Sequence, residues 1–266
     1  MKNLCIIPAR GGSKRIPRKN IKPFMGKPIM AYSIEAALGS GLFDEVMVST
    51  DDDEFAEVAQ KYGACVPFLR SAATANDFAT TADVLNEVLE RYKEFGRVFD
   101  SFCCLYSTAP FVTANRLKEA NDKLSAAVDA CFTMVQYSYP VQRGLQVNNI
   151  GYVEMTNPEY LRTRSQDLKP IYHDAGQFYF IKTKTFETEK TLWANRTAPL
   201  ILSELEVQDL DTETDWKLAE MKYKLLNNPV GGGYFYVGTS PLADKMSATA
   251  RLLNLRRTAE WHRLAS

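Results

Sequence analysis

Short apolar runs alternate with helix-patterned segments over most of this chain, and that alternation constrains its fold more than any other feature. The apolar runs have the length and composition of buried strands: residues 4–7, 45–50, 102–106, 130–135 and 178–181. Helical spacing of apolar residues predicts five helices: 29–38, one that begins at the aspartates 51–53, 81–95, 114–124 and 215–226. Such alternation indicates an α/β fold, with a mainly parallel sheet between helices on both faces.

The bulk composition excludes several classes of protein. The 266 residues suffice for one α/β domain with an appendage, and a formal net charge of zero gives no indication of a nucleic-acid partner. The five cysteines form no C-x-x-C pair, which is typical of buried thiols in a reducing compartment. The first apolar run is too short for a signal-peptide core, and no stretch reaches membrane-spanning length. We therefore expect a cytoplasmic protein without membrane insertion.

Two segments depart from the strand–helix alternation. Within a main domain predicted for residues 1–228, prolines and the turn residues around Gly151 predict hairpins or an arm at about 137–170. The aromatic side chains of this arm favour contact with a partner surface, although a hairpin folded onto its own domain would also explain them. Residues 229–266 are predicted to be a flexible joint and a basic helical tail. That tail is interpreted as a membrane-surface or partner contact, a docked extension or an appended segment.

The loop at residues 8–20 directly follows the first predicted strand, where open α/β sheets bind their ligands. Gly11 and Gly12 allow backbone N–H groups to approach a phosphate closely. Five cations lie within ten residues and match the charge of a triphosphate: Arg10, Lys14, Arg15, Arg18 and Lys19. A solvated basic loop is the alternative, but the combination of strand placement, paired glycines and cation density favours phosphate binding.

The stretch from Ile6 to Lys14, together with Lys19 and Asn20, resembles the signature loop of the acylneuraminate cytidylyltransferase family. The resemblance covers roughly residues 1–228. It implies that they form a catalytic domain with a three-layer Rossmann-like nucleotidyltransferase fold, a small β-rich dimerisation arm and a homodimeric assembly. It also implies a set of CTP-binding residues: Ala9, Arg10, Gly11, Gly12, Ser13, Lys14, Lys19, Asn20, Arg70, Asp77 and Thr80.

Two further stretches bear on the sugar that such an enzyme would use. Residues 105–111 resemble the family's "QPTSP" stretch, but Tyr106 replaces the glutamine and Ser107 the proline. Residues 172–180 are similar to the pseudaminic acid branch of the family. The resemblance implies sugar contacts from eight residues: Tyr106, Ser107, Thr108, Arg164, Gln166, His173, Asp174 and Gln177. For Arg164, a grip on the sugar carboxylate competes with a place on the surface or in a dimer interface. For His173, sugar recognition competes with packing.

Asp209 and Asp211 are two residues apart, so in an extended segment their side chains would share one face. Two carboxylates suit Mg²⁺, which takes hard oxygen ligands. Capping of the following helix by Asp211 and Thr212 is the alternative. The resemblance favours the metal, because the family's paired metal aspartates match these positions. It further implies that Arg10, Lys14 and Lys19 stabilise the leaving pyrophosphate and that Asp211 is catalytic.

The reaction implied by the resemblance is attack of a sugar's anomeric hydroxyl on the α-phosphorus of CTP, which gives a CMP-sugar and pyrophosphate. The predicted acceptor is a nine-carbon α-keto acid sugar, pseudaminic acid by the branch-level likeness, destined for surface glycans or for glycosylation of flagellin. The alternatives are synthesis of CMP-N-acetylneuraminate, activation of another keto acid sugar, such as one with eight carbons, and a catalytically silent nucleotide-binding regulator.

Overall fold

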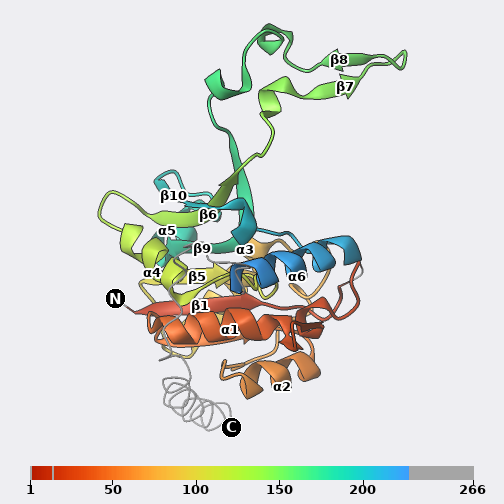
Figure 1. Ribbon diagram of the computed structural model, residues 1–266. Coiled ribbons are helices and arrows are strands. Elements are labelled where there is room, and N and C mark those ends of the chain that lie inside the picture. Colours follow the sequence, from red (N-terminus) through yellow and green to blue (C-terminus); the bar gives the residue numbers. More distant parts are fainter. Residues whose placement is uncertain (1, 14, 228–266) are drawn as a thin grey trace.

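The computed structural model of the protein describes residues 2–13 and 15–227, so Lys14 and the predicted tail at 229–266 lie outside the described residues. A six-stranded sheet with the strand order β10-β6-β9-β5-β1-β4 forms the centre of the domain (Figure 1). Its strands are β1 (Asn3–Pro8), β4 (Glu45–Ser49), β5 (Ser101–Leu105), β6 (Ala130–Gln136), β9 (Tyr172–Lys182) and β10 (Thr197–Leu202). The strand β9 runs antiparallel to β5 and β6, and the other neighbours pair in parallel.

Helices cover both faces of this sheet, as the strand–helix alternation predicts. The strand β1 shows the two-sided burial directly, because Cys5 and Ile7 belong to one apolar cluster and Leu4 and Ile6 to the other. The first cluster includes side chains of α1 (Ile29–Ser40), α2 (Asp53–Lys61) and α4 (Ala114–Lys123). The second includes side chains of α3 (Thr81–Glu94) and α5 (Thr183–Glu189). The predicted three-layer α/β fold with a mainly parallel sheet is therefore confirmed.

Local capping explains where several helices begin. The Asp52 carboxylate accepts a hydrogen bond from the backbone N–H of Phe55 at 3.1 Å, and Thr113 likewise caps α4. Thr80 and Asp83 exchange the reciprocal bonds of a capping box at the start of α3. The last described helix, α6 (Glu213–Asn227), packs on the beginning of α1 through a third apolar cluster that also includes Phe24.

Residues 137–170 form an arm that projects away from the sheet (Figure 1). It contains one two-stranded sheet, β7 (Leu145–Val147) and β8 (Val153–Met155), and three 3-10 helices: η2 (Val141–Arg143), η3 (Pro158–Tyr160) and η4 (Ser165–Asp167). The remaining elements are the small strands β2 (Pro23–Phe24) and β3 (Lys27–Pro28) and the 3-10 helices η1 (Lys19–Ile21) and η5 (Glu204–Glu206). Within the described part of the chain, no helix is long and apolar enough to cross a membrane.

Candidate active site

The carboxyl ends of β1, β4 and β5 meet at one edge of the sheet, and the glycine-rich loop begins there. Four consecutive backbone positions of the loop are each held by a different partner. Pro8 O accepts from the Ser107 hydroxyl at 3.0 Å, and the Ala9 N–H donates to Ser49 O at 2.9 Å. Arg10 O accepts from Asn20 Nδ2 at 2.9 Å, and the Gly11 N–H donates to an Asp51 carboxylate oxygen at 2.9 Å. The start of the loop is therefore fixed before any ligand binds.

The two glycines of the loop meet different surroundings. A Cβ atom built on Gly11 would lie 2.9 Å from Asp52 Oδ2 and 3.2 Å from Asp52 Cβ, so a larger residue requires the Asp52 side chain to shift. A Cβ built on Gly12 meets no atom within 4 Å. The first glycine thus serves packing within the protein, whereas the second leaves open space beside the loop. The N–H of Ser13 donates to Gly11 O at 3.1 Å and closes this tight turn.

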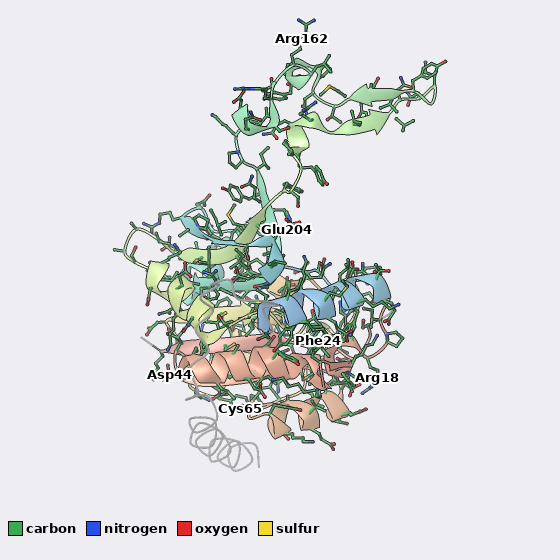
Figure 2. All side chains as sticks on the ribbon, viewed as in Figure 1. Arg18, Phe24, Asp44, Cys65, Arg162 and Glu204 are labelled. Carbon is green, nitrogen blue, oxygen red and sulfur yellow. The ribbon has the colours of Figure 1, made fainter. Side chains whose placement is uncertain are left out.

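The far end of the loop is anchored by an apolar contact instead. Ile16 is fully buried and belongs to the third apolar cluster, together with Leu210 and Trp216. Arg18 and Phe24 lie at the same end of the domain (Figure 2). Because Leu210 stands between Asp209 and Asp211, one apolar cluster positions both the basic loop and the acidic segment, which are almost 200 residues apart in sequence.

Carboxylates and carbonyls already surround the cations of the loop. Arg10 pairs with Asp77 at 2.7 Å, and Arg15 pairs with Asp211 at 2.5 Å. Lys19 Nζ donates to Leu210 O at 2.6 Å and lies 4.0 Å from Asp211 Oδ1. Burial lowers the pKa of the Lys19 ammonium, and the neighbouring aspartates oppose that shift. A triphosphate would exchange these internal acid partners for its own oxygens.

The two aspartates fit the donor set of a Mg²⁺ site, and the capping alternative fails for Asp211. The start of α6 is capped by Thr212 and Asp215, whose side chains exchange bonds with each other's backbone N–H at 2.7 and 3.2 Å. Asp211 instead faces Arg15 and Lys19. Among residues 2–13 and 15–227, no group of three or more histidine, cysteine, aspartate or glutamate side chains could hold a metal. Two carboxylates completed by phosphate oxygens and water are typical of Mg²⁺.

The remaining predicted nucleotide residues lie beside the loop. Arg70 is almost completely buried, and its guanidinium donates to Ser49 O at 2.7 Å and to Ser49 Oγ at 3.2 Å. Burial lowers the pKa of this guanidinium. The Asp77 carboxylate reaches Arg10, as described above, whereas Thr80 uses its hydroxyl in the capping box of α3. Lys14 lies outside the described residues, so its predicted role has no structural description.

A wide bulge in β9 lies among the residues that the sequence predicts to contact the sugar. Phe132 pairs with Tyr179 but Met134 pairs with Asp174, so two residues along β6 span five along β9. Gly176 adopts a positive φ of 61° inside the bulge. Burial raises the pKa of the Tyr179 hydroxyl, which therefore stays protonated and donates to Asp174 Oδ2.

A backbone hydrogen bond joins Tyr106 to Gln177 of β9. The Tyr106 N–H donates to Gln177 O at 2.9 Å, and the Gln177 side chain donates to Glu206 O at 2.5 Å. Thr108 is half-buried in the loop that follows β5. Five predicted sugar residues therefore lie at one end of β5 and β9: Tyr106, Ser107, Thr108, Asp174 and Gln177. The side-chain amide of Gln177 is buried and bonded within the protein.

The other predicted sugar residues lie on or near the arm. Arg164 is exposed just before η4 and pairs with Asp167 at 2.8 Å, and Gln166 is exposed within η4. Figure 1 shows that the arm carries this segment away from the basic loop of its own chain. His173 lies at the root of the arm, where its ring centroid is 4.7 Å from that of Tyr137. One chain by itself therefore does not bring Arg164 and Gln166 to the loop.

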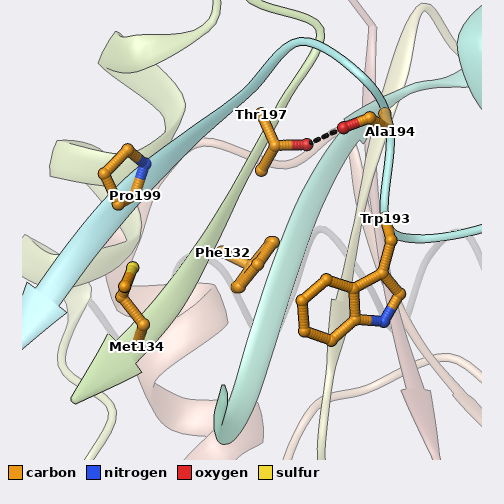
Figure 3. A pocket seen from close by; sticks show the side chains of 6 residues that line it. All are labelled: Phe132, Met134, Trp193, Ala194, Thr197 and Pro199. Carbon is orange, nitrogen blue, oxygen red and sulfur yellow. Dashed lines mark hydrogen bonds between the residues drawn. The ribbon is translucent and has the colours of Figure 1, made fainter. Parts of the chain in front are cut away.

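An apolar cavity of about 350 Å³, which no sequence pattern predicts, lies next to the bulge. Its lining side chains come from β6, β10 and the segment before β10 (Figure 3): Phe132, Met134, Trp193, Ala194, Thr197 and Pro199. A row of aromatic rings links this cavity to Tyr106, with centroid distances of 5.6 Å to Tyr179, 5.8 Å on to Phe132 and 4.6 Å on to Trp193. Each ring alone resembles an ordinary core residue in sequence.

A basic glycine loop after the first strand of such a sheet, with an aspartate of a distant acidic segment paired to its Arg15, is typical of α/β nucleotidyltransferases. A profile of the family described as "Cytidylyltransferase" matches residues 4–225. The pseudaminic acid cytidylyltransferase of Campylobacter jejuni is 44% identical over 226 residues, which cover 85% of this chain and 97% of that protein. The chain therefore belongs to the cytidylyltransferase family.

Other relatives place this chain among enzymes named for related sugars. The CMP-N,N'-diacetyllegionaminic acid synthase of Legionella pneumophila is 34% identical over 85% of this chain and 97% of its own length. A solved CMP:2-keto-3-deoxy-manno-octonic acid synthetase, complexed with CTP, superposes with a TM-score of 0.58 at 20% identity. That match covers 85% of this chain and 99% of the other, and at this identity it supports the fold alone.

Proposed function

We propose that this protein transfers CMP from CTP to the anomeric hydroxyl of a nine-carbon nonulosonic acid and releases pyrophosphate. The observation that carries the proposal is the position of Asp211 against Lys19 and Arg15, which joins the acidic segment to the phosphate loop. The names of the relatives from Campylobacter and Legionella support the same reaction. Phosphoryl transfer of this kind needs positioning and charge neutralisation more than covalent chemistry by the protein.

The residues of the loop supply the positioning. The open space beside Gly12 admits the phosphates, and Arg10 and Lys19 exchange their internal partners for phosphate oxygens. Their charges then neutralise the pyrophosphate as it leaves. Arg70, Asp77 and Thr80 remain proposed nucleotide residues because they flank this loop, with the sugar bound on the side of Tyr106 and β9.

We assign Mg²⁺ to Asp209 and Asp211, whose carboxylates offer the hard oxygens that this ion prefers. When bound, the ion would neutralise phosphate charge and increase the acidity of a nearby hydroxyl. The ion pair between Arg15 and Asp211 keeps that carboxylate in place near the loop until the ion binds. Lys19, which donates to the carbonyl between the two aspartates, orients the same segment.

Pseudaminic acid is the acceptor we favour, because the relative named for it is 44% identical over 85% of this chain. The apolar cavity beside Tyr179 suits the acyl groups of such a sugar, and a row of rings connects it to Tyr106. CMP-N-acetylneuraminate synthesis is the second candidate, since N-acylneuraminate cytidylyltransferases are 31% identical to this chain. The product would serve surface glycans or glycosylation of flagellin.

The proposed assembly is a homodimer that works in the cytoplasm. Exposed apolar side chains on the arm support the dimer, because they have no core of their own to enter. Five buried, free cysteines are consistent with the reducing compartment where CTP is available. A partner's arm would also give Arg164 and Gln166 a route to a sugar site, which their own arm does not provide.

The direct test is release of pyrophosphate in the presence of Mg²⁺, each of the four nucleoside triphosphates and a panel of nonulosonic and eight-carbon keto acids. We expect pyrophosphate with CTP only, and fastest with pseudaminic acid. If only an eight-carbon acid is turned over, the proposed acceptor is wrong. If another nucleotide supports turnover, the proposed donor is wrong. CTP binding without pyrophosphate from any sugar would contradict the enzyme and support a silent regulator.

A further inference from the structure

Two buried polar side chains next to the phosphate loop are used entirely within the protein. Asn20 is 7% exposed and Ser107 is 4% exposed, although both match positions for which the family resemblance implies contacts with substrates. Ser107 Oγ lies 2.9 Å from Asn20 Oδ1 and 3.0 Å from Pro8 O, so its single proton is shared between two oxygens of the protein. Asn20 Nδ2 donates to Arg10 O at 2.9 Å.

These contacts form a bridge across the base of the loop. Pro8 and Arg10 lie at its start and Asn20 at its end, while Ser107 lies at the carboxyl end of the neighbouring strand β5. Because buried amide and hydroxyl groups cost free energy when they lose a partner, the bridge holds the loop in one conformation. The loop then loses little conformational entropy when a phosphate binds to its N–H groups.

We infer that Ser107 is a positioning residue for the nucleotide, which acts through Asn20 on the backbone of Arg10 and does not contact the sugar. The inference rests on the proposed function for the identity of the nucleotide, but the bridge itself does not depend on which sugar is used. Loss of the hydroxyl would leave Asn20 Oδ1 without this buried donor and would loosen both ends of the loop.

A matched control exists in the same region of the fold. Ser33 is a fully buried serine of α1, and its hydroxyl donates to the carbonyl of Tyr106, the residue before Ser107, at 2.8 Å. Both Ser107→Ala and Ser33→Ala therefore remove one buried hydroxyl donor near the end of β5. Only the first variant removes a contact with the phosphate loop. A general loss of packing or stability would affect both variants, so a difference between them reports on the loop contact.

The experiment titrates the full-length wild type with all four nucleoside triphosphates by calorimetry, without sugar, and compares the variants with the nucleotide that binds. We expect Ser107→Ala to weaken binding between about twofold and tenfold, as loss of one hydrogen bond implies. Ser33→Ala should leave the dissociation constant for the nucleotide unchanged, and the KM for sugar should be the same in Ser107→Ala and wild type. Equal nucleotide affinity in Ser107→Ala and wild type, an equal loss in Ser33→Ala, or a raised KM for sugar alone would overturn the inference.

A double-mutant cycle with Asn20→Ala tests the proposed route of action. If Ser107 acts through Asn20, the loss in nucleotide affinity for the double variant should be smaller than the combined losses of the single variants. Independent, additive losses would contradict the bridge. Binding of a nucleotide other than CTP by the wild type would refute the proposed donor. The role of Ser107 would then be tested by comparing the affinities of wild type and variants for that nucleotide.

Discussion

Asp211 and Asp215 are four residues apart and take different parts in the structure. Asp215 accepts from the Thr212 N–H at 2.7 Å and belongs to the cap of α6. Asp211 lies against Arg15 and Lys19 of the phosphate loop. By spacing alone, either aspartate is suited to bind a metal or to cap the helix. The contacts in the structure distinguish the two roles. A substitution at each position therefore distinguishes metal binding from helix capping.

We expect Asp211→Ala to lower kcat by about 100-fold, since a lost metal ligand removes several kcal/mol of charge stabilisation. The same variant should bind Mn²⁺ more weakly, while its melting temperature stays close to that of wild type. Asp215→Ala should behave in the opposite way, with kcat retained and about 1 kcal/mol of unfolding free energy lost with the cap. Steady-state kinetics, Mn²⁺ titration and chemical denaturation measure these effects. Full activity in Asp211→Ala would refute the metal assignment.

The stability cost of Asp215→Ala should also depend on pH. Hydrogen bonds from Thr212 hold the pKa of Asp215 below its ordinary value. A carboxylate with a lowered pKa stabilises the folded state above its ordinary pKa and loses that contribution as the pH falls through the lowered value. The difference in unfolding free energy between wild type and variant should therefore shrink below about pH 4. A difference that stays constant down to pH 2 would contradict this cause.

At the scale of elements, the bulge in β9 is the feature that separates this sheet from a regular one. It includes Asp174 and Gln177, whose carbonyl accepts from the Tyr106 N–H, and Gly176 adopts a positive φ within it. A Cβ built on that glycine meets no atom within 4 Å, so substitution strains the backbone without a clash. Gly41, which ends α1 with a φ of 66°, has the same two properties and lies at the end of a helix.

Gly176→Ala and Gly41→Ala should each lower the free energy of unfolding by about 1 kcal/mol, the usual cost of a left-handed residue with a side chain. Only Gly176→Ala should raise the KM for sugar, because only that backbone adjoins Asp174 and Gln177. Denaturation curves and initial rates at saturating CTP measure the two effects. An unchanged KM in Gly176→Ala would show that the bulge does not shape the sugar site.

At the scale of the whole molecule, the arm has too little interior to be stable by its own packing. The hairpin carries five apolar side chains that are about two-thirds or more exposed: Leu145, Val147, Ile150, Tyr152 and Val153. A two-stranded hairpin is marginal in water unless its apolar face is covered. A second copy of the chain would supply that cover.

We expect the wild type to sediment at about twice the 30.0 kDa of one chain. Val153→Asp should raise the dimer dissociation constant at least about tenfold, because an unpaired charge is costly to bury. Val98→Asp is the control, since Val98 is 63% exposed on the main domain and lies outside the arm. Analytical ultracentrifugation over a range of concentrations distinguishes them. A monomeric wild type, or equal weakening by both variants, would argue against the arm as the interface.

The sequence by itself determined the layers of the fold and the place of the basic glycine loop after the first strand, because both depend on local patterns. Continuous apolar runs identified five strands, of which β1, β4, β5 and β6 agree closely in position with the structure. The strand β10 and the helix α5 were missed, since their short, partly exposed segments lack a clear period. The antiparallel direction of β9 was not predicted either, because a single strand carries no local sign of its neighbours.

Only the tertiary structure decided how the candidate site is assembled. Asp211 reaches Arg15 across 196 positions of sequence, and Ser107 reaches Asn20 across 87. The aromatic row from Tyr106 to Trp193 also crosses the two strands β9 and β6. Local patterns report the periodicity of a segment, whereas these contacts depend on the order of the strands and on the bulge in β9. The sequence could therefore name most of the candidate residues, but the packing of the sheet determined which of them meet.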